Sequence, residues 1–589
     1  MLYPLSYGGT CEVPHEINTS RHGLENRSGG TGCARADLDW ATVTPEELSA
    51  AIRAALSDAV DAGDLTVDVP AEIRVERPKQ KAHGDWTSNI ALQLAKPSGL
   101  KPRDLAVIVA DRLRETAGIA SVDIAGPGFL NITFDAASAG ELARSIVSAG
   151  AAYGRNEAMT GHRMNIEFIS ANPTGPLHIG HTRWAALGDS MRRLLVASGA
   201  DVTAEYYIND AGAQMDNFGA SVLARAKGEP TPEGGYPGAY VDDLAATALR
   251  LRPDLLDLPE DEALAVARQI GYETQLGDIQ STLSDFGVEF DVWFSEKTLH
   301  EGGAVESAIE RLREQGHVDD RDGAVWLRTT DFGDDKDRVM VRSDGVPTYF
   351  AADAAYYLDK KDRGFPEKIY LLGADHHGYV SRLKAIAACA GDDPERNIEI
   401  RIGQLVNLGG AKLSKRAGNI IELRDLISWI GTDAVRYSLA RYPADSPLSL
   451  DGEELRKQTN DNPVFYVQYA HARTFNVARL AAEDGVDRSA GFDPSLLDDP
   501  TEATLLAALG DFPRVVAHAA QLREPHRVAR YLEDLAGHFH KWYDTCRVRP
   551  RSDEEITDTH RTRLWLNDAT RQVLANGLDL LGVSAPERM

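Results

Sequence analysis

The chain has 589 residues, of which 43% are hydrophobic and 26% are charged, so whole-chain disorder and a membrane protein are both disfavoured. That length exceeds what one hydrophobic core can organise and suggests roughly three or four domains. The 63 basic and 90 acidic residues give a net charge of −27. This charge disfavours non-specific binding of nucleic acid over the whole surface, although a local basic face is compatible with it.

The sequence contains no apolar run long enough for a membrane helix, and its start lacks the apolar core of a secretory signal. We therefore expect a cytoplasmic protein without membrane contact. The four cysteines form no Cys-x-x-Cys pair, which disfavours both a disulfide framework and a zinc ribbon.

Residues 1–43 are rich in Gly, Ser, Thr and Asn without sustained periodicity, which predicts a disordered N-terminal extension. Folded structure is expected to begin at Thr44, a good helix N-cap that precedes Pro45 and the capping-box residue Glu47. Helical and strand patterns alternate over residues 44–142, which predicts a compact α+β domain.

Two later segments share the pattern of an apolar strand, a loop with glycine and histidine, and a helix. The first runs from "MNIEFIS" through "ANPTGPLHIGH" to "TRWAALGDSMRRLLVASG", and the second is "KIYLLGADHHGYVSRLKAIAACAG". Continuous apolar strands are typical of a buried parallel sheet, in which ligands bind beyond the carboxyl ends of the strands. Both histidine loops are therefore expected to converge within residues 155–432.

The last part of the chain, residues 433–589, has a helical pattern throughout. Strand patterns vanish there, and apolar residues recur with helical period in runs such as "NPVFYVQYAHARTFNVARLAA" and "TRLWLNDATRQVLANGLDLLG". We predict an all-α helical bundle.

The segment "PLHIGH" has the features of a phosphate-binding turn. Its glycine and proline allow the backbone to approach a ligand, and His178 and His181 fall on one face of the first helical turn. The free amides and the dipole of that turn attract phosphate, to which the histidines can donate hydrogen bonds. On spacing alone, a structural turn with incidental histidines explains the segment equally well, whereas a metal pair is disfavoured because no third ligand is nearby.

A second segment suited to polyphosphate is "GGAKLSKRAGNII", in which Lys412 and Lys415 lie three residues apart between glycines. A solvated basic turn would have the same composition. The two segments together resemble the HIGH and KMSKS motifs of class I aminoacyl-tRNA synthetases, which activate an amino acid with ATP. The resemblance implies an α/β multidomain protein with a Rossmann-type parallel-sheet catalytic domain, an N-terminal α+β domain and a C-terminal helical bundle.

The same resemblance implies the residues that handle ATP. Catalytic roles are expected for His178, His181, Lys412 and Lys415. Lys415 is expected to bind the pyrophosphate, because the segment before HIGH contains no lysine that could replace it. The full set expected to bind ATP is Gly175, Pro176, His178, Gly180, His181, Lys412, Ser414 and Lys415.

Longer stretches resemble arginyl-tRNA synthetases in particular, from about residue 44 to the C-terminus. They include "EFISANPTGPLHIGH", "YYINDAGAQM", "GADHHGYVSRLKA" and "DAVRYSLARYPADSPLSLD". This resemblance implies that L-arginine is activated with ATP to arginyl-adenylate and is then transferred to the 3′-terminal adenosine of tRNA(Arg). It also implies Mg²⁺ bound with ATP, no zinc, a connective insertion over roughly residues 205–325, and a monomer.

The expected arginine site suits the chemistry of a guanidinium, which presents five donors in one plane and requires oxygen acceptors. Asp353 is expected to hold the guanidinium, and Glu167 and Asn172 the α-amino and carboxylate end. His376 is an alternative to His377, and an exposed acid on the helix surface is the alternative for Asp353. Position by position, the arginine site falls on Glu167, Asn172, Tyr349, Asp353 and His377.

The resemblance also implies contacts with tRNA in both terminal domains. From Arg514 to Arg551, eight Lys or Arg stand against four Asp or Glu, so the helical domain is locally basic. Aromatic and arginine side chains there could stack on unpaired bases, although packing inside each domain is the alternative for all of these positions. The matching positions are Tyr469, Arg473, Tyr543 and Met589 in the anticodon-binding domain, and Asn131 and Phe134 in the N-terminal domain.

Three other functions are compatible with parts of this pattern. Another class I synthetase would keep both motifs but would lack the arginine-site and N-terminal matches. A small-molecule nucleotidyltransferase would not need so long a helical bundle. A non-catalytic tRNA-binding relative would be expected to have eroded motifs, and here both are intact.

Overall fold

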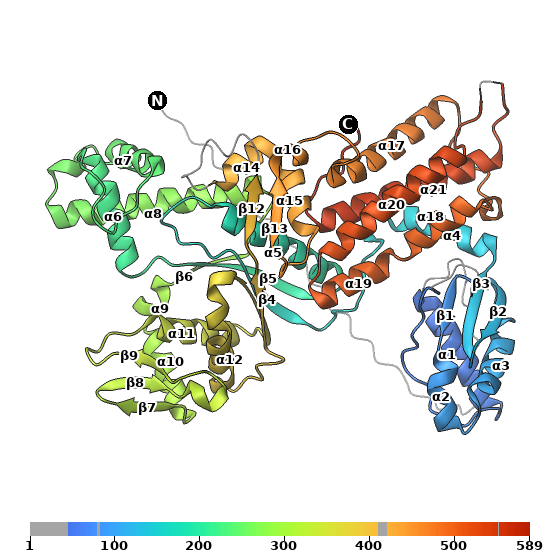
Figure 1. Ribbon diagram of the computed structural model, residues 1–589, viewed down its shortest axis with the longest axis horizontal. Coiled ribbons are helices and arrows are strands. Elements are labelled where there is room, and N and C mark those ends of the chain that lie inside the picture. The colour runs from blue at the N-terminus through green and yellow to red at the C-terminus, as the bar shows by residue number, and fades with distance from the viewer. Residues whose placement is uncertain (1–44, 79–82, 410–420, 552) are drawn as a thin grey trace, which may run out of the picture. The chain divides into compact units, whose positions relative to one another are not determined.

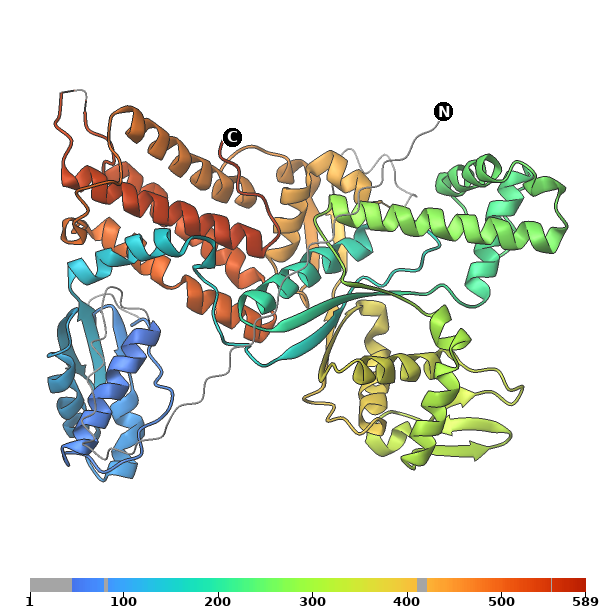
Figure 2. The same ribbon diagram turned by 180° about the vertical axis from the view of Figure 1, so that it is seen from behind.

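The computed structural model describes residues 45–78, 83–409, 421–551 and 553–589 (Figure 1 and Figure 2). The predicted extension over residues 1–43 lies outside the described residues, as do Thr44, Lys412, Ser414 and Lys415. None of the described helices is long and apolar enough to cross a membrane.

The first described domain is an antiparallel sheet with helices packed on it. Its strands pair in the order β1 (Trp86–Ser88), β3 (Phe129–Phe134) and β2 (Ile119–Ala125). Its helices are α1 (Pro45–Asp61), α2 (Ile90–Ser98) and α3 (Pro102–Leu113). Leu56 of α1, Val109 of α3 and Ile132 of β3 are fully buried between the helices and the sheet. The predicted α+β domain is confirmed.

Helix α4 (Ala136–Ala149) crosses the expected end of this domain at residue 142 but packs with the C-terminal helices. Its Ala143 and Ile146 are fully buried in the same core as Leu505 and Leu509 of α18 (Pro500–Gly510). A helical pattern identifies an apolar face but not the element that covers it, so the sequence alone does not assign α4 to the bundle.

A five-stranded parallel sheet forms the centre of the molecule. Its order is β11 (Ile398–Gly403), β10 (Glu367–Gly373), β4 (Arg163–Glu167), β5 (Asp201–Ile208) and β6 (Val292–Ser295). All four neighbouring pairs are parallel. The chain runs outward from β4 to β6 and then places β10 on the other side of β4, which is the strand order of a Rossmann-type fold. The predicted catalytic fold is confirmed.

Helix α5 (Ile179–Ala197) follows β4 and packs closely against it. A Cβ at Gly188 would lie 2.4 Å from the ring of Phe168, so only a glycine lets the helix approach the end of β4 this closely. The helix ends where Gly199 adopts a φ of 92° and turns the chain into β5. The first glycine therefore sets how closely α5 packs, and the second sets where it ends.

The expected insertion over residues 205–325 is not continuous, because β6 returns to the central sheet within it. Before β6, the helices α6 (Ala213–Ala226), α7 (Ala239–Leu251) and α8 (Glu260–Asp285) share a core around Phe218 and Leu244. After β6, a three-stranded antiparallel sheet and the helices packed on it form a second group of elements. It comprises α9 (Lys297–Glu301), α10 (Ala304–Glu314), β7 (Val318–Arg321), β8 (Ala324–Leu327), β9 (Arg338–Val341), α11 (Tyr349–Asp362) and α12 (Val380–Cys389).

The C-terminal part is a helical bundle, as predicted. Its helices are α14 (Leu423–Ile430), α15 (Thr432–Ala440), α16 (Gly452–Leu455), α17 (Pro463–Glu483), α18, α19 (Phe512–Leu522), α20 (His526–Thr545) and α21 (Asp558–Leu580). The prediction that strands end before residue 433 is wrong at one place. The four-residue strand β13 (Leu448–Asp451) pairs in parallel with β12 (Val406–Gly409), and it is too short to give a clear strand pattern.

Gly140→Ala tests the docking of α4 on the bundle. A Cβ there would lie 2.5 Å from the backbone carbonyl oxygen of Pro494, so we expect the free energy of unfolding to fall by about 1–3 kcal/mol in denaturant titrations. Gly277→Ala is the matched control, since nothing lies within 4 Å of that site on α8 and alanine favours a helix. Equal stability of the two variants would contradict the packing described for α4.

Candidate active site

A cavity of about 940 Å³ opens at the carboxyl ends of the parallel strands. It lies where the strand order reverses between β4 and β10, the position at which open α/β sheets bind ligands. Each of the five strands contributes a lining residue at or near its carboxyl end, namely Glu167, Tyr207, Glu296, Gly373 and Gly403.

Most of the residues predicted to bind ATP or arginine in the described chain meet at this cavity. Those that line it are Glu167, Asn172, His178, Gly180, His181, Tyr349 and Asp353. Gly175 and Pro176 precede the helix without lining the cavity. The 3₁₀ turn η5 (Ala374–Tyr379) presents His376 to the cavity, and His377 does not line it, so the geometry favours the alternative histidine.

The two histidines of the HIGH segment are held as hydrogen-bond donors. His178 is the N-cap of α5, and its Nδ1 accepts a hydrogen bond from the Gly180 amide at 3.1 Å. The Nδ1 of His181 accepts from the His178 amide at 3.3 Å. Burial lowers the pKa of His178, which favours its neutral form. A neutral imidazole that accepts at Nδ1 carries its proton on Nε2, so these contacts leave Nε2–H of each ring as the donor.

The chain that follows residues 410–420 is joined to the HIGH segment. The Ile179 amide donates to the carbonyl of Ile421 at 3.0 Å, and the Leu423 amide donates to the carbonyl of Leu177 at 2.8 Å. His178 and Glu422 thus pair as in an antiparallel bridge. This clamp brings the end of the "GGAKLSKRAGNII" segment to the start of α5.

The turn between β4 and the HIGH segment has an unusual backbone. Ile169 and Ser170 have φ values of 70° and 42°, in the left-handed region that a β-branched residue such as isoleucine rarely enters. The Ser170 hydroxyl donates to Oε1 of Glu167 at 3.2 Å and accepts from the Tyr207 amide at 3.2 Å. Strain of this kind is typical of functional sites, and here it directs the chain around the cavity.

Two buried glutamates lie side by side below the cavity. Glu167 on β4 and Glu205 on β5 are register partners, and α11 supplies a cation to each. Lys360 Nζ lies 2.6 Å from Oε2 of Glu167 and close to the rings of two tyrosines, whereas Arg363 donates two hydrogen bonds to Glu205 at 2.7 and 2.8 Å. Glu167 therefore has one oxygen committed to Lys360 and presents the other, Oε1, beside Ser170.

Two further acids make the inner part of the cavity a site for a cation. Asp353 lies one helical turn after Tyr349 on α11. Its burial and the nearby charges of Glu296 and Glu167 raise its pKa to about 7, although the charge of Arg382 acts in the opposite direction. Glu296 is buried, and that burial raises its pKa as well. A ligand with a delocalised positive charge would relieve this repulsion and satisfy both acids.

Sequence analysis did not identify Glu296. It follows the four-residue strand β6 inside the segment expected to be an insertion, so nothing marked it as a neighbour of the HIGH segment. An acid directly after "DVWFS" was the available signal, because polar residues at the carboxyl ends of parallel strands face the ligand side of the sheet.

The positions matched to anticodon contacts form a cluster on α17 and α20. The guanidinium carbon of Arg473 lies 5.1 Å from the ring centre of Tyr469 and 4.8 Å from that of Tyr543. Its Nη1 donates to Nδ1 of His540 at 3.2 Å. Tyr469 is half-buried and Tyr543 is 38% exposed, so the cluster presents part of its aromatic surface to solvent.

The other positions matched to tRNA contacts differ in exposure. Met589 at the C-terminus is 56% exposed. In the N-terminal domain, Asn131 is only 7% exposed in the central strand β3, and Phe134 is half-buried at the end of that strand. For Asn131 the burial favours the alternative of a structural role.

Within the described residues, no group of three or more His, Cys, Asp or Glu side chains is arranged to hold a metal ion.

Comparison with known proteins finds three family models along the chain. The model of the arginyl tRNA synthetase N terminal domain matches residues 46–134, that of the tRNA synthetases class I (R) catalytic domain matches residues 270–438, and that of the DALR anticodon binding domain matches residues 467–589. The chain is 69% identical to the arginine–tRNA ligase of Renibacterium salmoninarum over 550 residues, which cover 93% of this chain and 100% of the relative.

Two further comparisons agree with this result. The arginine–tRNA ligase of Paenarthrobacter aurescens is 68% identical over 93% of this chain and 100% of its own length. The structure of the Thermus thermophilus arginyl-tRNA synthetase has the same fold, with a TM-score of 0.71 and 22% identity over 93% of this chain and 100% of that one.

The raised pKa of Asp353 predicts that binding of a guanidinium compound depends on pH. Below about pH 7 this carboxyl is protonated, and the ligand must displace the proton; the affinity for free arginine should therefore fall about tenfold per pH unit below pH 7 and level off above it. Titration calorimetry between pH 6 and 8 should detect proton release that grows as the pH falls. An affinity that is constant over this range would contradict the prediction.

Proposed function

This chain belongs to the arginine–tRNA ligase family of class I aminoacyl-tRNA synthetases, and we propose that its cavity binds arginine and ATP side by side. The observation that carries the proposal is the division of one cavity into two chemically different ends. An acidic recess contains Asp353 and Glu296, and a helix start carries His178 and His181. The first suits a guanidinium and the second suits phosphate.

Arginine enters the recess with its guanidinium toward Asp353 and Glu296. Tyr349, at the mouth, covers the aliphatic part of the side chain. Asn172 faces the other end of the amino acid; its Oδ1 accepts from Asn209 at 2.8 Å and its Nδ2 donates to Gln214 at 3.0 Å, which keep the amide in place. Glu167 offers its Oε1 to the α-ammonium group, because its Oε2 is held by Lys360.

The reaction needs no protein nucleophile. A carboxylate oxygen of arginine attacks the α-phosphorus of ATP, the bond to the β,γ-pyrophosphate breaks, and arginyl-adenylate forms. The Nε2–H groups of His178 and His181 donate to phosphate oxygens as negative charge develops there. The 2′-hydroxyl of the terminal adenosine of tRNA(Arg) then attacks the arginyl carbonyl, and AMP leaves.

The clamp between Leu177–Ile179 and Ile421–Leu423 supports a role for the adjoining KLSKR segment. We assign the pyrophosphate to Lys412, Ser414 and Lys415 on the family resemblance, although these residues lie outside the described part of the chain. Mg²⁺ enters as the Mg–ATP substrate. The protein acts as a monomer in the cytoplasm, a state that sizing by light scattering would test.

The anticodon arm of tRNA(Arg) binds at the cluster of Tyr469, Arg473 and Tyr543. A half-exposed aromatic ring beside a guanidinium can stack on an unpaired base and contact its backbone phosphate. The C-terminal Met589 is a further contact on this domain.

The test of the arginine site is arginine-dependent charging of tRNA(Arg), with lysine and citrulline as controls. Asp353→Asn and Glu296→Gln should each raise the KM for arginine roughly 100-fold, because each removes a charged hydrogen-bond partner of the guanidinium. Asp362→Asn is the matched control on the same helix, since its carboxylate pairs with Arg311 and does not line the cavity. Charging that is independent of arginine, or an unchanged KM in both cavity variants, would refute the proposal.

The test of the tRNA site is Arg473→Ala. Loss of the stacked guanidinium should weaken tRNA(Arg) binding about tenfold in filter-binding or anisotropy titrations, while the KM values for arginine and ATP stay the same. Arg479→Ala on the same helix is the control, because Arg479 is exposed and pairs with Glu483. If both variants bind tRNA equally, the cluster is a structural feature of the bundle.

A further inference from the structure

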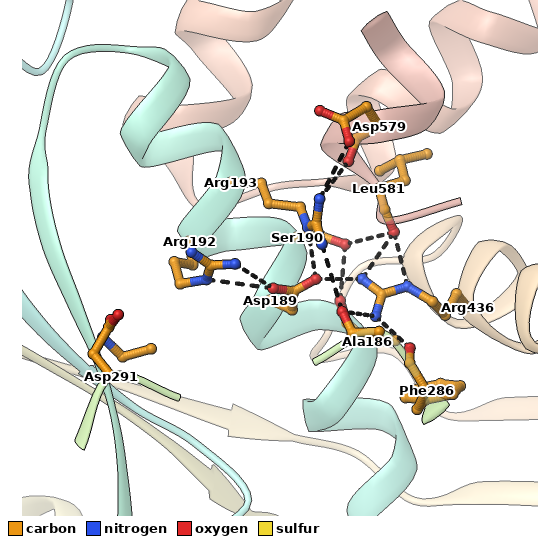
Figure 3. A network of polar contacts seen from close by, with 12 residues as sticks. Ala186, Asp189, Ser190, Arg192, Arg193, Phe286, Asp291, Arg436, Asp579 and Leu581 are labelled. Carbon is orange, nitrogen blue, oxygen red and sulfur yellow. Dashed lines mark hydrogen bonds and ion pairs between the residues drawn. The ribbon is translucent and has the colours of Figure 1, made fainter. Parts of the chain in front are cut away.

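A fully buried ion pair joins the helix of the HIGH segment to the C-terminal bundle. Arg436 on α15 and Asp189 on α5 are both completely inaccessible to solvent, and Nη2 of Arg436 donates to Oδ2 of Asp189 at 2.5 Å. Figure 3 shows the guanidinium surrounded by groups from several elements. We call this set of contacts around Arg436 and Asp189 the junction.

The same guanidinium holds the carboxyl ends of two other helices. Arg436 Nη1 donates to the carbonyls of Phe286 at 2.9 Å and Gly287 at 3.2 Å, where α8 ends. Its Nε and Nη2 donate to the carbonyl of Leu581, the C-cap of α21, at 3.2 and 3.1 Å. Cations are favoured at helix carboxyl ends, so Arg436 joins α8 and α21 to Asp189 of α5 (Figure 3).

The backbone is shaped to admit this side chain. Gly582, directly after the C-cap of α21, has a φ of 64°, and a Cβ there would lie 1.9 Å from Nη2 of Arg436. Any other residue would displace the guanidinium. The contact is therefore a built feature of the fold and not an incidental pairing of two charges.

Further bonds fasten α5 to α21 around the ion pair. The Ser190 hydroxyl donates to the carbonyl of Leu581 at 3.3 Å. Arg193 donates to Asp189 at 2.7 Å and lies 3.3 Å from a carboxylate oxygen of Asp579 on α21. Arg192 donates to the other oxygen of Asp189 at 3.0 Å, so both oxygens of that carboxylate are engaged.

A buried ion pair often contributes little net stability, because desolvation offsets the attraction, but it demands one geometry. Here that geometry connects two functional regions. The start of α5 carries His178 and His181, about 16 Å and about 12 Å along the helix from Asp189. Helix α21 packs against α17 and α20, which carry the cluster of Arg473, Tyr469 and Tyr543.

We propose that Arg436 and Asp189 are positioning residues through which the anticodon-binding helices set the placement of α5, so that tRNA bound at the Arg473 cluster aligns His178 and His181 for catalysis. This inference rests on the proposed function. Neither residue touches a substrate; each acts through the helix that it holds.

A double-mutant cycle on the full chain tests this coupling, with kcat for arginine charging measured at saturating tRNA(Arg). Arg436→Lys keeps the charge but loses the planar fork, and it should lower kcat about tenfold while the tRNA Kd stays within about twofold. Arg473→Ala should also lower kcat at saturating tRNA. The double variant should have the same kcat as Arg436→Lys alone. In both variants the contact that links the Arg473 cluster to α5 is already lost.

Arg441→Lys provides the matched control cycle. Arg441 closes the same helix α15 and forms a forked ion pair with Glu533 of the bundle, but none of its hydrogen bonds within the described chain reaches α5. Its effect on kcat should add to that of Arg473→Ala. If Arg436→Lys lowers the yield of folded protein, Ser190→Ala replaces it in the cycle, since it removes only one hydrogen bond of the junction.

Additive effects in the Arg436 or Ser190 cycle would overturn the inference, as would an Arg473→Ala variant with unchanged kcat. These results differ from failure of the proposed function, in which the wild-type chain would not charge tRNA(Arg) with arginine at all. The junction would be only structural if Arg436→Lys and Arg441→Lys lowered kcat equally and if each gave the same coupling energy with Arg473→Ala.

Discussion

Two glutamates on adjacent parallel strands organise the centre of this molecule. Glu167 and Glu205 face each other in register inside the sheet, where two unpaired carboxylates would each cost several kcal/mol in desolvation and would also repel each other. Lys360 and Arg363, one helical turn apart on α11, supply the compensating charges. Because both pairs must form together, the rotation of α11 about its axis is fixed.

The proposed arginine site follows from that constraint. Asp353 lies two turns before Lys360 on the same face of α11, so the rotation that neutralises the glutamates also directs Asp353 toward the cavity. Glu296 approaches from the end of β6. The recess therefore holds two neighbouring acids, and burial together with the charges of Glu296 and Glu167 raises the pKa of Asp353.

The end of the cavity that we propose for ATP is built by different means. It depends on backbone geometry and on imidazole donors, since the backbone amides that donate to Nδ1 of His178 and His181 fix the tautomers of both rings. Helix α5 lies between this end and the buried junction of Asp189 and Arg436. One helix therefore carries the proposed phosphate-binding histidines at its start and the attachment of the C-terminal bundle in its middle.

Much of this could be predicted from the sequence, because the signals are local. Short segments are enough to predict several features, because their patterns do not depend on which residues pack against them. These features are the strand–loop–helix around HIGH, the histidine pair, the helical C-terminal part and the family resemblance. Asp353 and Tyr349 were also accessible in this way, since they share one helix face.

What only the tertiary structure decided depends on contacts between distant segments. Lys360 on Glu167, Glu296 in the recess, His376 in place of His377, α4 on the bundle and Arg436 on Asp189 each join residues that no periodicity connects. A pattern along the chain reports which face of an element is apolar; it does not report which charge will lie opposite a buried carboxylate. That choice is made by the packing of helices against strands, and here it determines both the substrate recess and the junction.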